Sequence, residues 1–101
     1  MVASLLACGG GGSSTGGSGP DAVTIQNFAF GPANLTVATG TTVTWTNADQ
    51  STHTVTADDK SFDAGNVAPG HSFTFRFQHA GSYAYHCNIH QYMRAAITVT
   101  G

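Results

Sequence analysis

The stretch "TTVTWTN", residues 41–47, decides the fold because its side chains alternate strictly between polar and apolar. Successive side chains of an extended strand point to opposite faces. Val43 and Trp45 therefore share one face, and Thr42, Thr44 and Thr46 share the other. The stretch "SFTFRF", residues 72–77, repeats this pattern with three phenylalanines on one face. Such strands can bury their apolar faces by packing one sheet on another.

The same alternation recurs along residues 21–101, between segments rich in Gly, Asn and Pro. We expect strands at residues 22–28, 35–38, 41–47, 53–57, 72–77, 82–87 and 95–100. No stretch sustains the 3.6-residue apolar period of a helix, although "DDKSFDAGN", residues 58–66, has room for one helical turn. The sequence thus predicts an all-β domain, a Greek-key β-sandwich of about seven or eight strands.

The composition excludes several classes of function. Charged residues make up 8% of the chain and the net charge is −2, against about 25% charged residues in a typical domain. No basic patch is available for nucleic acid, and no apolar run is long enough to span a membrane. The sequence also lacks the Ser-His-Asp set, the acidic pair or the phosphate-binding loop of common enzymes. We therefore expect a protein that is not an enzyme.

Residues 1–20 differ from the rest of the chain. "MVASLLAC", residues 1–8, resembles the lipobox of bacterial lipoproteins, in which the cysteine, here Cys8, is lipidated. No Lys or Arg precedes the apolar stretch, which is also short for a signal peptide, so Cys8 as an ordinary thiol is the alternative. The Gly- and Ser-rich segment up to Pro20 has the composition of a flexible tether. We expect a signal or lipobox remnant and tether at residues 1–20, and an exported, lipid-anchored domain at residues 21–101 in the periplasm or cell envelope.

A second motif, "YAYHCNIHQYM" at residues 83–93, carries the candidate chemistry. Alternation turns Cys87 inward with the two tyrosines before it and turns His86 outward. Residues three apart in a tight turn return to one side, so Cys87, His90 and Met93 can converge. His53 can join them from the strand at 53–57, where a buried imidazole needs a polar partner.

The donor set would be one thiolate, two imidazoles and one thioether. Soft sulfur ligands favour copper, imidazole suits both of its oxidation states, and this set is the one found in blue-copper electron-transfer sites. Zinc also accepts Cys and His, but a thioether is a poor zinc ligand. A disulfide between Cys8 and Cys87 is a further alternative. The sequence favours one copper ion that cycles between Cu(I) and Cu(II).

With these motifs the chain resembles the cupredoxins, the type 1 blue copper proteins of the plastocyanin and azurin group. The resemblance is carried by "NFAFGPANLTVATGTTVTWTNADQSTHTVTA" (27–57), "SFDAGNVAPGHSFTFRF" (61–77) and "GSYAYHCNIHQYM" (81–93). The spacing of two residues between Cys and His, and again between His and Met, is most similar to amicyanin-like bacterial members. The resemblance implies that His53, Cys87 and His90 are strong equatorial ligands and that Met93 is a weak axial ligand.

The resemblance also implies a function. Cupredoxins carry single electrons between redox partners such as a dehydrogenase, a cytochrome or an oxidase, and they bind these partners transiently. Docking is expected at an apolar patch around the exposed edge of the second histidine; its expected members are His90, Ile89, Tyr92, Phe30 and Pro32. We expect a monomer that contacts the membrane only through a lipid on Cys8. The alternative function is copper storage, delivery or sensing without redox turnover.

One residue departs from the family pattern. Many cupredoxins have Asn directly after the first histidine ligand, where its side chain ties the two ligand loops together, and this chain has Thr54. A hydroxyl can make such a tie, and the Thr54 backbone N–H remains available to the cysteine sulfur, but the dual reach of an amide is lost. Groups that contact the ligands tune a metal site.

Overall fold

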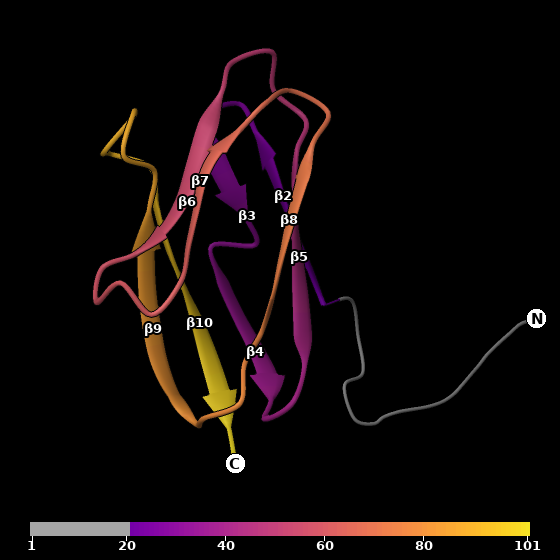
Figure 1. The fold of residues 1–101 in the computed structure, drawn as a ribbon, viewed down its shortest axis with the longest axis vertical. Coiled ribbons are helices and arrows are strands. Elements are labelled where there is room, and N and C mark those ends of the chain that lie inside the picture. Colours follow the sequence, from indigo (N-terminus) through magenta and orange to yellow (C-terminus); the bar gives the residue numbers. More distant parts are fainter. Residues whose placement is uncertain (1–20) are drawn as a thin grey trace, which may run out of the picture.

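The computed structural model describes residues 21–101, and the predictions for Cys8 and the tether fall outside these described residues. Within residues 21–101, nine strands form two facing sheets (Figure 1). The strands are β2 (Ala22–Gln26), β3 (Ala29–Gly31), β4 (Asn34–Ala38), β5 (Thr42–Asn47), β6 (His53–Ala57), β7 (Asp63–Val67), β8 (Ser72–Arg76), β9 (Gly81–His86) and β10 (Arg94–Thr100). One sheet has the order β4-β10-β9-β6-β7 and the other β3-β2-β5-β8. The predicted all-β sandwich is confirmed.

The chain passes repeatedly from one sheet to the other instead of forming one continuous meander. Two of the pairings, β10 with β4 and β2 with β5, are parallel. The described part contains no helix that could cross a membrane. Because β6 and β9 are neighbours, the start of β6 and the residues that follow β9 lie at the same end of one sheet (Figure 1).

Two strands were not expected from the sequence. The predicted strand at 22–28 ends at Gln26, because Asn27 and Phe28 adopt positive φ angles of 56° and 57°. Two such residues make the tight turn of a two-residue hairpin, and β3 follows it. The helical turn expected within residues 58–66 is also wrong: β7 begins at Asp63 and pairs with β6. Since β6 is an interior strand, it needs a hydrogen-bonding partner on both sides.

Trp45 fills the centre of the sandwich. It is fully buried, as the alternation in β5 predicts. Its ring centroid lies 5.6 Å from those of Phe62, Phe73 and Tyr85 and 6.3 Å from that of Phe77. Aromatic rings at such separations stabilise the core by more than the burial of their apolar area alone.

Tyr85 offers a test of this core. Burial raises the pKa of Tyr85 to about 12, and among the described residues its hydroxyl has no hydrogen-bond partner. An unsatisfied buried polar group costs about 1–3 kcal/mol, so Tyr85→Phe should raise the free energy of unfolding by about 1 kcal/mol. Tyr83→Phe is the matched control, because the Tyr83 hydroxyl donates to the His79 carbonyl at 2.7 Å. Urea unfolding of the metal-free protein would contradict the account if the two variants were destabilised alike.

Candidate metal centre

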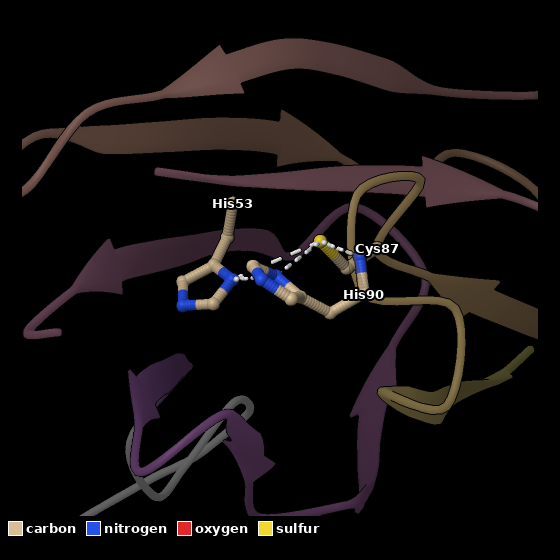
Figure 2. Close-up of side chains that lie close together, drawn as sticks. All are labelled: His53, Cys87 and His90. Carbon is tan, nitrogen blue, oxygen red and sulfur yellow. Dashed lines mark hydrogen bonds between the residues drawn. The ribbon is translucent and has the colours of Figure 1, made fainter. Parts of the chain in front are cut away.

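Two neighbouring strands bring the predicted ligands together. β6 begins at His53 and β9 ends directly before Cys87. Cys87 Sγ lies 3.8 Å from His53 Nδ1 and 3.9 Å from His90 Nδ1, and the two Nδ1 atoms are 3.2 Å apart. Figure 2 shows these three side chains turned toward one another. His53 and Cys87 are fully buried, whereas His90 is half-buried.

The loop after β9 returns Met93 to the same region. The Met93 N–H donates to the His90 carbonyl at 2.9 Å, and the Cys87 N–H donates to the Met93 carbonyl at 3.1 Å. The Met93 side chain is buried, at 2% exposure. These two backbone bonds form the tight turn that the three-residue spacing predicts.

His86 lies outside the group, as the alternation in β9 predicts. Its Nδ1 is 2.6 Å from Asp58 Oδ1 and its Nε2 is 2.9 Å from Asn88 Oδ1. Both ring nitrogens are therefore occupied on the outer face of the sheet. His86 is not available to the cluster formed by His53, Cys87 and His90.

Two backbone donors point at the cysteine sulfur. The Thr54 N–H lies 3.3 Å from Cys87 Sγ and the His90 N–H lies 3.5 Å from it. These two bonds hold the sulfur in place between the two imidazoles. The thiolate is the form of cysteine that binds metals.

The Thr54 hydroxyl ties β6 to the loop that carries the other expected ligands. Its Oγ1 accepts the Asn88 N–H at 2.7 Å and lies 3.2 Å from Thr56 Oγ1. The Thr56 hydroxyl donates to Asp63 Oδ1 at 3.2 Å. Because a hydroxyl has one hydrogen, Thr54 must be the donor to Thr56. The chain Asn88–Thr54–Thr56–Asp63 therefore links the ligand loop to β6 and β7.

Thr54→Val tests this tie, because valine has a similar shape but cannot accept the Asn88 N–H. Leaving such a partly buried donor unpaired should lower the free energy of unfolding of the metal-free protein by about 1–2 kcal/mol. Thr54→Ser keeps the hydroxyl and serves as the control. Equal thermal stability of the valine variant and the wild type would show that the tie contributes nothing.

Asp49 contacts His53 and was not among the site residues predicted from the sequence. Its Oδ2 lies 2.8 Å from His53 Nε2, and its carboxylate also accepts the N–H groups of Asn27 and Phe28. Burial raises the pKa of the Asp49 carboxyl, but the hydrogen bonds from Phe28, His53 and Asn27 outweigh this effect and hold it below its usual range. No local pattern marks Asp49, because its donors come from β6 and from the distant β2–β3 turn.

An exposed apolar surface surrounds His90. Phe28, Ile89 and Tyr92 are 40%, 50% and 71% exposed. The Phe28 ring meets the imidazole of His90 edge-on at 5.0 Å, and the Tyr92 ring lies 6.2 Å from that imidazole. We call the three exposed residues Phe28, Ile89 and Tyr92 the apolar rim.

Phe30, expected in the docking patch, is buried at 4% exposure, and that prediction is wrong. The turn at residues 27–28 directs Phe30 into the core, where its ring lies 4.8 Å from that of Tyr85. Phe28 takes the exposed position instead. Pro32 is exposed directly after β3, as expected of a surface residue.

The donor chemistry fits copper. One sulfur and two imidazole nitrogens lie within 4.8 Å of one another, and a buried thioether follows in the same loop. Thiolate and thioether suit Cu(I), imidazole suits both oxidation states of copper, and a thioether is a poor ligand for zinc. A hard cation such as magnesium or calcium would require oxygen ligands, and none belongs to this cluster.

Comparison with known proteins agrees with this chemistry. The family model for a cupredoxin-like domain matches residues 3–99. A chloroplastic plastocyanin from Tetradesmus obliquus is 38% identical over 75 residues, which are 63% of this chain and 52% of that protein. A plastocyanin from Scenedesmus fuscus is 34% identical over 85 residues, 71% of this chain and 87% of that protein.

A solved structure has a similar fold. The Cu(I) form of an amicyanin that carries a single substitution superposes with a TM-score of 0.75 at 28% identity. The match covers 82% of this chain and 84% of that one. The chain thus spans about half of the first plastocyanin but most of the second and of the amicyanin.

Proposed function

Because the chain belongs to the cupredoxin-like family, we propose that it is a type 1 copper protein that carries single electrons between redox partners. The observation that carries this proposal is the convergence of Cys87 Sγ, His53 Nδ1 and His90 Nδ1 within 4.8 Å. In this proposal these three residues are the strong ligands and Met93 is the weak axial ligand. Copper held there supplies a one-electron couple between Cu(I) and Cu(II).

The chain's own residues suit a carrier. His53 begins β6, Cys87 directly follows the paired strand β9, and both side chains are fully buried. The N–H groups of Thr54 and His90 fix the sulfur. Preorganised side chains on rigid strands move little when the charge of a site changes. A set of four protein ligands also leaves no place for a substrate, so we propose a carrier and not an enzyme.

The apolar rim is the proposed docking surface. Its three residues lie beside His90, the least buried member of the cluster. The proposed partners are redox proteins such as a dehydrogenase, a cytochrome or an oxidase. With a net charge of −2, steering by charge is weak, so small apolar contacts and transient binding are expected. We further propose a monomer, exported to the periplasm or cell envelope and anchored by a lipid on Cys8.

The alternative is a protein that stores, delivers or senses copper. Voltammetry of the copper-loaded protein, combined with a Cu(I) chelator, separates the two functions. A carrier should give a reversible one-electron wave and lose copper to the chelator slowly, because three of its four proposed ligands, His53, Cys87 and Met93, are buried. An irreversible wave with rapid loss of copper would support delivery and oppose the proposal.

Docking at the apolar rim is tested with Ile89→Asp. Two protein molecules that exchange electrons rim to rim would then face each other with like charges, which is unfavourable at an interface. We expect the electron self-exchange rate, measured by NMR line broadening, to fall about tenfold or more. Thr98→Asp is the control, because it adds the same charge at an exposed position on β10. If both variants slowed electron self-exchange equally, the exchange would not take place through the apolar rim.

A further inference from the structure

Three hydrogen-bond donors meet at one carboxylate outside the ligand set. Asp49 Oδ2 accepts from His53 Nε2 at 2.8 Å and from the Phe28 N–H at 2.9 Å. Asp49 Oδ1 accepts from the Asn27 N–H at 2.7 Å. The Asp49 side chain is only 11% exposed, so water has little access to compete for these bonds.

The first of these bonds fixes the form of the His53 ring. An ionised carboxylate can only accept hydrogen bonds, so the proton of a neutral His53 lies on Nε2. Nδ1 then carries the free lone pair, and it faces Cys87 Sγ at 3.8 Å and His90 Nδ1 at 3.2 Å. A hydrogen bond at one ring nitrogen determines which nitrogen is free to bind a metal.

The other two bonds hold a turn that covers the site. Asn27 and Phe28 both have positive φ angles, 56° and 57°, and such a backbone is unusual for a residue as bulky as phenylalanine. In this conformation the Phe28 ring meets His53 edge-on at 5.4 Å and His90 at 5.0 Å. Unfavourable backbone conformations persist only where the surroundings hold them, and here both N–H groups bind Asp49.

The loop that carries Asp49 is held independently of its carboxylate. The buried Asn47 side chain accepts the Asp49 N–H at 2.9 Å and donates to the carbonyls of Ser51 at 2.8 Å and Val67 at 2.9 Å. Substitution of the Asp49 side chain should therefore leave the path of residues 47–51 intact.

We propose that Asp49 is a positioning residue, whose single carboxylate orients His53 as a ligand and holds Phe28 over both imidazoles. The effect of Asp49 on the redox couple rests on the proposed function. Its structural role, the orientation of His53 and Phe28, can be tested in the metal-free chain. A negative charge beside a ligand favours the more positively charged, oxidised state of a site. Asp49 therefore lowers the reduction potential.

Asp49→Asn removes the charge and keeps the shape of the side chain. The blue band should remain, and the equilibrium should shift about tenfold toward Cu(I), which is a potential about 59 mV higher for one electron. Asp59→Asn is the control, because Asp59 carries the same charge at an exposed position in the β6–β7 turn, and it should shift the equilibrium less than about twofold. Equal shifts in both variants would overturn the proposal.

NMR of the metal-free protein tests the structural role. The imidazole nitrogen shifts of wild-type His53 should indicate the Nε2–H form. In Asp49→Ala this proton and the amides of Asn27 and Phe28 should exchange with water about tenfold faster or more. A wild-type His53 protonated at Nδ1, or unchanged exchange in the variant, would overturn the proposal. If the wild type gave no blue copper complex, the proposed function would fail, and this experiment would still decide the role of Asp49.

Discussion

Replacing Cys87 with serine should abolish the intense visible band of the copper-loaded protein. The band of a blue copper site arises from the thiolate–copper bond, and a serine hydroxyl does not replace a thiolate as a soft ligand. Cys87 is fully buried and 3.8–3.9 Å from both imidazole nitrogens, so no other residue can take its position. Absorption spectra after addition of one equivalent of copper(II) provide the measurement.

The second cysteine of the chain supplies the control. Cys8→Ser should leave the band unchanged, because Cys8 lies in the predicted tether. A band that persisted in Cys87→Ser, or that was lost in Cys8→Ser, would contradict the assignment of Cys87 as the copper-binding cysteine.

Trp45→Ala should cost about 3–5 kcal/mol of the free energy of unfolding. The indole is fully buried against the rings of Phe62, Phe73, Phe77 and Tyr85, so its removal leaves a cavity in the middle of the core. Since small domains are stable by only about 5–15 kcal/mol, the metal-free variant should melt at a temperature lower by at least about 12 °C.

Tyr92→Ala is the matched control for this large effect. It also removes an aromatic ring, but Tyr92 is 71% exposed, and such surface substitutions change stability by less than about 0.5 kcal/mol. Similar melting temperatures for the Trp45 and Tyr92 variants would show that Trp45 is not the centre of the core.

Local patterns explain why much of the fold was predictable. The side chains of β5 lie on the faces that alternation assigns, and β6 has the predicted bounds of residues 53–57, although all five of its residues are buried. β7 could not be predicted in the same way, because Gly65 and Asn66 have low strand propensity. β7 forms through its pairing with β6, a contact that no local pattern shows.

Phe30 was expected in the exposed docking patch, but it is buried, and Phe28 is exposed beside His90 instead. If the strand at 22–28 were continuous, the side chains of Phe28 and Phe30 would point in other directions. The chain instead reverses at Asn27 and Phe28. A small shift in where a strand ends moves each later side chain to the other face. Asn27–Phe28 is an uncommon sequence for such a turn, since Asn-Gly is the usual signal.

The sequence predicted those residues of the candidate site that lie close together along the chain. It did not predict the contacts between segments that are distant in the sequence. Cys87, His90 and Met93 lie in one short loop, so their convergence follows from their spacing. His53 was added because an imidazole buried in the predicted strand at 53–57 needs a polar partner. The contact of Asp49 with His53 depends on how residues 47–51 fold over the β2–β3 turn. The partner of the Thr54 hydroxyl likewise depends on the position of Asn88.

The most direct test of the central claim is a copper(II) titration of the purified protein followed by its visible spectrum. Four ligands that include one thiolate predict an intense blue band that grows linearly and saturates at one copper per chain. Reduction should remove the colour and reoxidation should restore it. A colourless or pale complex at saturation would contradict the assignment of His53, Cys87, His90 and Met93 as a type 1 copper site.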